Sequence, residues 1–315
     1  MLPYHKSVNV LLLGLGNASW LYAERNPNHR FKTHTHSIIS LPGLQLVAGC
    51  ELNQKLASEW SSKFGLPAYS ELSQVDLEID LVVVAVSHAN LLDQTREALV
   101  RWPDAKILVE KPFVVTESQL DLVEKFNTND LQRIWVNFPR NFQPETELLR
   151  KIISGHLQLG VDEKLNWNGN YSGGFLNTSS HFISLVNYLF GEYHLELLPG
   201  VEEFGMAYTI TGPSVKGSML EVAGPISTGS VAIFGTGFKV DYIDGGEEIS
   251  VTTKEQGEFG IQSTRSTYQL EVYRRLLQIW EGSENNVGTL SSELYNLRQM
   301  IYLQKSREVD LGPGN

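Results

Sequence analysis

The first 136 residues alternate between short apolar runs and helical stretches, and this alternation limits the possible folds most strongly. Five apolar runs have the length of strands, at residues 8–13, 44–50, 81–86, 106–109 and 133–136. Stretches with helical patterns lie between them, among them 54–64, 90–101 and 118–126. Continuous apolar strands separated by helices indicate a parallel sheet that is covered on both faces. We therefore predict an α/β domain over residues 1–136 with a doubly wound, Rossmann-type sheet.

The pattern changes after Phe142, and we predict a second, α+β domain over residues 137–315. Helical patterns cover residues 145–154, 175–190, 267–280 and 290–305. Between them, residues 193–260 are rich in β-forming residues and are divided by turn signals such as Gly212-Pro213 and Gly245-Gly246. Consecutive strands joined by short turns predict a large, open antiparallel sheet.

Composition excludes several classes of function. The chain has 315 residues and a net charge of −11, which disfavours general binding to nucleic acids or to anionic membrane surfaces. Its only cysteine, Cys50, allows no internal disulfide. The apolar runs are far shorter than the roughly 20 residues that span a bilayer, and the N-terminal run does not have the form of a signal peptide. We expect a cytoplasmic protein with no nucleic-acid or membrane partner.

A glycine turn follows the first predicted strand directly. Gly14 permits a tight turn, and Gly16 lets the backbone approach a pyrophosphate at the start of a helix. The third glycine of the usual dinucleotide-binding pattern is replaced by Ser19. Residues 25–32 have the composition of a loop, so we expect the first helix to begin near Thr33.

An acidic residue, Glu51, ends the second predicted strand. A carboxylate in that position accepts hydrogen bonds from the adenosine ribose and repels a 2′-phosphate, so NAD is favoured over NADP as the cofactor. Glu51 lies 37 residues after Gly14 (51 − 14), which indicates an insertion between the glycine turn and the second strand.

Two further motifs carry residues suited to catalysis. Lys111 follows the fourth predicted strand in Glu110-Lys111-Pro112, where its ammonium group could hold a substrate hydroxyl. Asn177 and His181 lie four residues apart on the predicted helix that follows Gly173-Gly174, and a histidine there could act as a general base. Taken singly, Lys111 fits a surface lysine before a turn better than a catalytic residue, and a histidine such as His181 is more often a hydrogen-bonded structural residue. His34 and His36 do not face the same side of a helix, so we predict no metal site.

Together these motifs resemble the Gfo/Idh/MocA family, which includes glucose–fructose oxidoreductase and inositol dehydrogenase. The resemblance covers essentially the whole chain and includes the stretch Val136-Asn137-Phe138-Pro139-Arg140. It implies an NAD(P)-dependent enzyme that transfers a hydride between nicotinamide and a hydroxyl or carbonyl carbon of a sugar or sugar derivative. The long loop before Thr33 is similar to one branch of the family, which is linked with surface-polysaccharide metabolism.

The resemblance also assigns roles, with the nicotinamide lying between the domains. It implies that Lys111 and His181 are catalytic and that Asn177 and Arg140 bind the substrate. It implies a cofactor site made of Gly14, Gly16, Asn17, Glu51, Val86, Ser87, Glu110, Lys111 and Pro112. Many family members have aspartate at the position of Asn177. Two alternatives stay open: a reductase of a non-sugar substrate on the same scaffold, and an inactive cofactor-binding protein, in which Asn177 would be the trace of the lost activity.

The predicted antiparallel sheet also suggests self-association. Residues 193–260 offer too little helix to cover both faces of their sheet. Because an uncovered apolar face is usually buried against a partner, we expect a homodimer or homotetramer.

Overall fold

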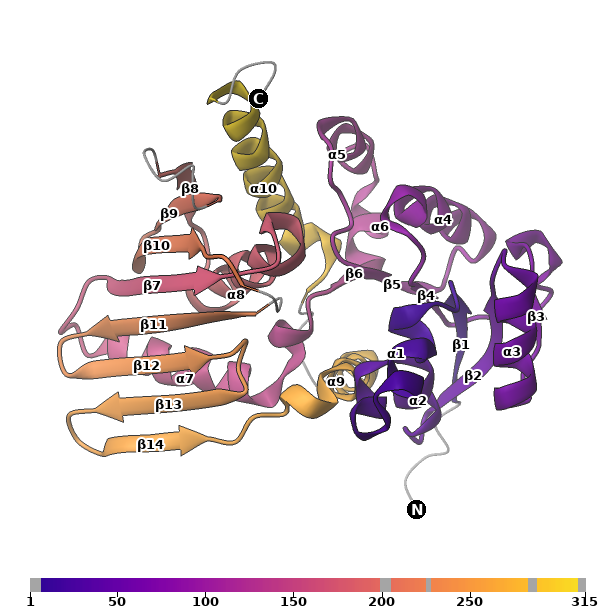
Figure 1. Cartoon of the computed structure of the whole chain (residues 1–315), viewed down its shortest axis with the longest axis horizontal. Coiled ribbons are helices and arrows are strands. Elements are labelled where there is room, and N and C mark those ends of the chain that lie inside the picture. The colour runs from indigo at the N-terminus through magenta and orange to yellow at the C-terminus, as the bar shows by residue number, and fades with distance from the viewer. Residues whose placement is uncertain (1–6, 199–204, 225–227, 283–287, 311–315) are drawn as a thin grey trace. The chain divides into compact units, whose positions relative to one another are not determined.

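The computed structural model describes residues 7–198, 205–224, 228–282 and 288–310, and divides into two compact units (Figure 1). The N-terminal unit comprises Met1–Phe142 and Ser266–Glu293, and the C-terminal unit comprises Gln143–Arg265 and Leu294–Asn315. These units differ from the two contiguous domains expected from the sequence. The segment Ser266–Glu293 packs with the N-terminal half of the chain, although it comes late in the sequence.

The N-terminal unit contains a six-stranded sheet in which all neighbouring strands are parallel. Its strands are β1 (Val8–Leu13), β2 (Leu44–Cys50), β3 (Ala68–Tyr69), β4 (Leu81–Val84), β5 (Lys106–Glu110) and β6 (Ile134–Asn137). The spatial order β3-β2-β1-β4-β5-β6 reverses direction next to β1, as in a doubly wound Rossmann sheet. The predicted fold is confirmed, and β3 is a sixth strand that was not predicted from the sequence pattern.

Helices connect these strands and cover the sheet. They are α1 (Tyr22–Arg25), α2 (His34–Ile39), α3 (Gln54–Phe64), α4 (His88–Arg101), α5 (Glu117–Val123), α6 (Thr128–Arg133) and, from late in the chain, α9 (Tyr268–Trp280). Side chains of Asn53, Thr116 and Asn127 cap α3, α5 and α6 by accepting backbone N–H bonds at their first turns. Tyr273 and Leu276 of α9 are buried in the same core as the strands.

The segment after the glycine turn differs from its prediction. A five-residue π-helical turn, Asn17–Leu21, begins directly after Gly16 and continues into α1, followed by a 3-10 segment, Pro27–Lys32. The expectation that the first helix begins near Thr33 is therefore wrong. The buried Ser19 hydroxyl donates to the Gly14 carbonyl, and the Trp20 indole donates to the Leu15 carbonyl at 2.7 Å. These two bonds fold the chain back onto the glycine turn.

The C-terminal unit contains an eight-stranded, mostly antiparallel sheet. Its strands are β7 (Leu165–Tyr171), β8 (His194–Leu197), β9 (Ala207–Thr211), β10 (Val215–Glu221), β11 (Gly229–Gly235), β12 (Phe238–Ile243), β13 (Glu248–Thr253) and β14 (Gly257–Ile261). The order is β14-β13-β12-β11-β7-β10-β9-β8, and among the described strands only β7 and β10 pair in parallel. The predicted sheet is confirmed, but β7, near its centre, lies outside the stretch predicted to form it.

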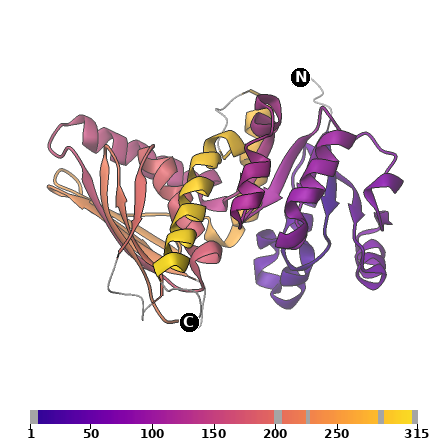
Figure 2. The same ribbon diagram turned by 90° about the horizontal axis from the view of Figure 1, so that it is seen from above.

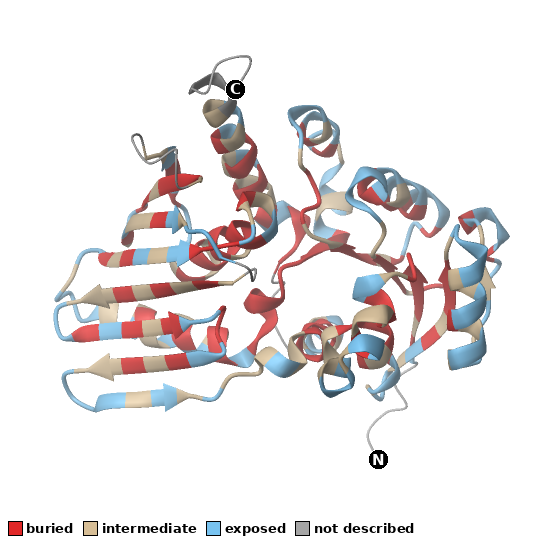
Figure 3. Ribbon diagram, viewed as in Figure 1, coloured by how far each residue is buried: buried red, intermediate tan, exposed pale blue. Residues whose placement is uncertain are grey.

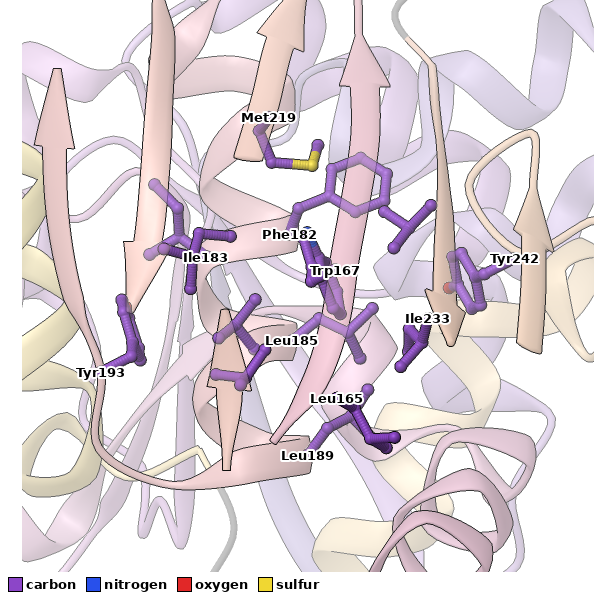
Figure 4. Close-up of a cluster of buried hydrophobic side chains, with 14 of the residues drawn as sticks. Leu165, Trp167, Phe182, Ile183, Leu185, Leu189, Tyr193, Met219, Ile233 and Tyr242 are labelled. Carbon is purple, nitrogen blue, oxygen red and sulfur yellow. The ribbon is translucent and has the colours of Figure 1, made fainter. Parts of the chain in front are cut away.

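Helices pack on one face of this sheet (Figures 1 and 2). They include α7 (Pro144–Gln158) and α8 (Ser180–Phe190), and residues of α10 (Leu290–Asp310) join the same core. Figure 4 shows Trp167 and Ile233 of the sheet beside Phe182 and Leu185 of α8. Burial of such large apolar side chains is the main favourable contribution to folding of this unit.

Along the strands of the eight-stranded sheet, buried residues alternate with less buried ones (Figure 3). The less buried residues form the other face of the sheet, which is mostly polar. Its residues include Asn166, Asn168 and Asn170 of β7, Lys216, Ser218 and Leu220 of β10, Ser230, Ala232 and Phe234 of β11, and Lys239, Asp241 and Ile243 of β12. The face is uncovered, as expected, but it is not the apolar surface on which the prediction of self-association was based. The oligomeric state therefore stays a prediction.

Candidate cofactor and catalytic site

A pocket of about 560 Å³ opens at the carboxyl ends of β1, β2 and β4. It is lined by Leu13, Gly14, Gly16, Cys50, Glu51, Leu52, Ser70, Glu71, Leu72, Ser73, Ala85, Val86, Ser87, Asn90, Gln94 and Glu97. Ligands of doubly wound sheets bind at this edge, where the strand order reverses. Five of the predicted cofactor residues, Gly14, Gly16, Glu51, Val86 and Ser87, therefore share one pocket. Asn17 is exposed at the start of the π-helical turn but does not line the pocket.

The two glycines of the turn have different surroundings. Gly14 has a φ of +83°, and a Cβ added to it would lie 2.6 Å from the Ala85 carbonyl oxygen. Its N–H donates to the Cys50 carbonyl at 2.8 Å, which ties the turn to β2. Around Gly16, no heavy atom of the described residues lies within 4 Å of an added Cβ. This open space beside the start of a helix fits a pyrophosphate group.

Glu51 is held at the pocket by two backbone N–H groups. Its two carboxylate oxygens accept hydrogen bonds from Leu15 N and Asn53 N, both at 2.9 Å. Glu71 and Glu97, which the sequence analysis did not identify, line the same pocket. No lysine or arginine is among the described lining residues. The pocket is thus suited to ribose hydroxyls and unsuited to an additional phosphate.

The Cys50 thiol lies in the wall of the same acidic pocket. Burial, together with the charges of Glu97, Glu51 and Glu71, raises the pKa of Cys50 to about 11. Cys50 therefore stays a neutral, unreactive side chain in the pocket wall at physiological pH.

The Glu110-Lys111-Pro112 motif stands at the end of β5, and the Lys111–Pro112 peptide bond is cis. The Glu110 carboxylate accepts a hydrogen bond from Asn137 and lies 2.9 Å from His34 Nε2. Burial alone would raise the pKa of Glu110. The hydrogen bonds and charge of its neighbours His34, Asn137 and Lys111 outweigh that effect and hold the pKa below its usual value. Glu110 is therefore an anion directly beside Lys111.

Arg140 and Pro112 are both buried. Arg140 belongs to a 3-10 turn, Pro139–Phe142, and its exposed fraction is 3%. The Arg140 guanidinium is therefore poorly accessible to a substrate from solution.

In the C-terminal unit, Asn177 and His181 lie at the start of the helix predicted for residues 175–190. Gly173 and Gly174 both have positive φ, and a π-helical turn, Phe175–Ser179, precedes α8. The helix therefore begins as a π-helical turn and changes to a regular α-helix at Ser180, between Asn177 and His181. The Ser179 hydroxyl lies 2.5 Å from the buried Tyr208 hydroxyl and anchors this turn to β9. Asn177 is exposed and His181 is half-buried, so solvent reaches both side chains.

The described residues contain no group of three or more His, Cys, Asp or Glu side chains placed to hold a metal ion. His34, which is two residues before His36 in the sequence, is buried and lies against Glu110. Within the same described ranges, no helix is long and apolar enough to cross a membrane.

Comparison with known proteins agrees with this arrangement. Residues 8–138 match the Gfo/Idh/MocA family model, which is described as an oxidoreductase family with an NAD-binding Rossmann fold. No curated protein matches the chain.

Solved structures share the fold over nearly the whole chain. A Gfo/Idh/MocA family oxidoreductase from Vibrio cholerae is 15% identical, with a TM-score of 0.71, and the match covers 97% of this chain and 100% of that one. An oxidoreductase from Agrobacterium radiobacter in complex with NAD+, L-tartaric acid and magnesium is 13% identical, with a TM-score of 0.71 and 96% coverage of both chains. A 3-ketoreductase from Actinomadura kijaniata in complex with TDP-benzene and NADP is 13% identical, with a TM-score of 0.69, and the match covers 94% of this chain and 96% of that one.

The Rossmann sheet, its glycine turn and the pocket beside it define a dinucleotide-binding oxidoreductase. Residues 8–138 match the NAD-binding Rossmann fold of the Gfo/Idh/MocA oxidoreductase family, and the chain as a whole shares its fold with solved oxidoreductases such as the one from Vibrio cholerae.

Proposed function

We propose that this protein is a dehydrogenase or reductase that transfers a hydride between NAD and a hydroxyl or carbonyl carbon of a sugar or sugar derivative. The observation that carries the proposal is the pocket in which the glycine turn and Glu51 meet. The bound nicotinamide would accept or return the hydride, while the protein supplies binding, orientation and proton transfer. L-Tartaric acid and a TDP derivative, which are bound in two structures of the same fold, are both oxygen-rich molecules.

Lys111 and His181 are the proposed catalytic residues. In the oxidation direction, His181 takes the proton of the substrate hydroxyl as the hydride leaves the carbon that bears it. Lys111 donates a hydrogen bond to the same oxygen and stabilises the negative charge that develops on it. In the reduction direction, His181 returns the proton to the carbonyl oxygen.

Asn177 and Arg140 are the proposed substrate contacts. The Asn177 amide can orient a hydroxyl but cannot take its proton, so general-base catalysis falls to His181. Arg140 could hold a carboxylate or phosphate of the substrate. Because the Arg140 side chain is 3% exposed, that contact requires its surroundings to rearrange when the substrate binds.

NAD is proposed as the preferred cofactor. The charges of Glu51, Glu71 and Glu97 all oppose the 2′-phosphate that distinguishes NADP. We also propose that the enzyme is cytoplasmic, which fits its single, buried cysteine. A role in surface-polysaccharide metabolism would be consistent with a sugar substrate.

The direct test is turnover with NAD or NADH on a panel of polyols, aldoses, sugar acids and nucleotide sugars, together with mass spectrometry of ligands retained on purification. Turnover of a member of this panel supports the proposal. Turnover limited to non-sugar carbonyls or double bonds would favour the alternative reductase.

A second candidate function is a cofactor-binding protein without catalytic activity, and it is favoured by the asparagine at position 177, where many family members have aspartate. The variant Asn177→Asp distinguishes this candidate from an active enzyme. In an active enzyme, this substitution should alter the pH profile of turnover. If it creates turnover that the natural chain lacks, the chain is an enzyme that has lost its activity.

A further inference from the structure

A buried chain of polar groups ends at Glu110, the residue before Lys111. Tyr273 OH lies 2.7 Å from His34 Nδ1, and His34 Nε2 lies 2.9 Å from the Glu110 carboxylate. On the other side, Asn137 Nδ2 donates to the same Glu110 oxygen and also to Gln269 at 2.9 Å. All five residues belong to the N-terminal unit, and they come from α2, β5, β6 and α9.

Burial and charge fix two features of this chain. Burial and the negative charge of Glu110 hold the pKa of Tyr273 well above its usual value, so its phenol stays protonated. Because a carboxylate can only accept hydrogen bonds, His34 Nε2 donates to Glu110. His34 thus joins the buried phenol of Tyr273 to the Glu110 anion.

Stability alone does not account for this arrangement. Apolar side chains of similar volume often stabilise a core as well as a buried ionic network does. Tyr273 is fully buried and His34 is 1% exposed, yet two successive hydrogen bonds connect them to a carboxylate at the end of a strand. Glu110 pairs in register with Asn137 of β6, so backbone and side chain are both fixed at this point. The residue that follows is Lys111.

We propose that His34 and Tyr273 are positioning residues for Lys111, acting through Glu110. The network fixes the Glu110 carboxylate, and this anion then attracts the adjacent Lys111 ammonium and restricts where it lies. The inference concerns the same site as the proposed function and rests on it for the catalytic meaning of Lys111. The placement of Lys111 can nevertheless be measured without any substrate.

The test is competitive acylation of lysines in the whole protein, with mass spectrometry used to read the labelling of Lys111 relative to Lys55. Lys55 is 86% exposed and serves as an internal reference. In Tyr273→Phe and His34→Leu, labelling of Lys111 should change by about two- to tenfold, the range implied by the net free energy of one hydrogen bond. His34→Gln places an amide donor near the position of Nε2 and should restore labelling toward the natural value.

Tyr242→Phe is the matched control. It also removes a buried tyrosine hydroxyl, which donates to the Gly245 carbonyl at 3.1 Å in the C-terminal unit. This variant should leave the labelling of Lys111 unchanged. Thermal unfolding of every variant establishes that the folded protein is being compared.

Unchanged Lys111 labelling in folded Tyr273→Phe and His34→Leu would overturn the proposal, as would an equal change in Tyr242→Phe. Once a substrate is known, Tyr273→Phe should lower kcat while leaving the Kd for NAD unchanged. If the labelling of Lys111 changes as expected in the Tyr273 and His34 variants while Lys111→Ala keeps full turnover, that result would support the positioning of Lys111 by His34 and Tyr273. It would contradict the proposed catalytic role of Lys111.

Discussion

Gly14 and Gly16 are glycines for different reasons, and this difference can be tested. Alanine at Gly14 would combine a φ of +83° with a contact of 2.6 Å to a backbone oxygen. We expect Gly14→Ala to lower the free energy of unfolding by about 2 kcal/mol or more. Gly16→Ala meets no described atom within 4 Å. It should leave the unfolding temperature nearly unchanged but weaken NAD binding by about tenfold or more, because the methyl group occupies the space proposed for the pyrophosphate. Thermal unfolding and calorimetric titration with NAD check both variants, and equal effects on stability would contradict the distinction.

Glu51 is expected to govern the choice between the two cofactors. Calorimetry should show tighter binding of NAD than of NADP, and Glu51→Ser should narrow this preference. Glu71 and Glu97 remain in the same pocket, so the preference should narrow without reversing. Equal or tighter binding of NADP by the natural protein would show that these carboxylates do not face the 2′-phosphate.

At the scale of elements, Asp162 links the end of α7 to the turn between β11 and β12. Its carboxylate accepts hydrogen bonds from His156 at 2.9 Å and from Thr236 N at 2.7 Å. These bonds lower the pKa of Asp162 below the ordinary value of 3.8. Their contribution to stability is therefore present above pH 3.8 and is lost as the pH falls through the lowered value in the folded protein.

The variant Asp162→Asn should accordingly be less stable than the natural protein at pH 7, and the difference should shrink below pH 3.8. Denaturant unfolding across this pH range measures it. A difference that stays constant with pH would show that the charge of Asp162 does not contribute.

Elements with strong periodicity were predictable from the sequence, and those without it were not. The apolar runs at β1 and β2 match their predicted bounds. In contrast, β3 has only two residues, too few to show a pattern. In β7, Asn166, Asn168 and Asn170 are poor strand formers, although they alternate with buried residues. The π-helical turn after Gly16 depends on hydrogen bonds of Ser19 and Trp20 that no periodicity reveals.

The candidate site was predictable where local sequence determines it. The glycine turn and Glu51 each follow a recognisable strand, and the structure brings them to one pocket. Glu71 and Glu97 join that pocket from elements whose side-chain directions only the fold defines. The contact between His34 and Tyr273 joins residues 239 positions apart, a pairing that a single sequence does not show.

At the scale of the whole molecule, we expect a homodimer or homotetramer. The uncovered face of the eight-stranded sheet is broad, and Ala232, Phe234 and Leu220 lie among its polar residues. Light scattering at micromolar concentration should show an assembly larger than the chain's 35.3 kDa. If this face forms the contact, Phe234→Glu should shift the protein toward the monomer without changing NAD affinity. A monomeric natural protein would contradict the expectation.

NAD-dependent turnover in the variants Lys111→Ala and His181→Ala, with the Kd for NAD measured in parallel, tests the proposed chemistry directly. The glycine turn and Glu51 are proposed to hold the adenosine half of the cofactor, whereas Lys111 and His181 are proposed to act on the reacting oxygen. Each variant should therefore lose turnover by about 10²–10⁴-fold, the usual contribution of a general acid–base group, while its NAD affinity stays nearly the same. Full turnover in both variants would contradict the proposed chemistry.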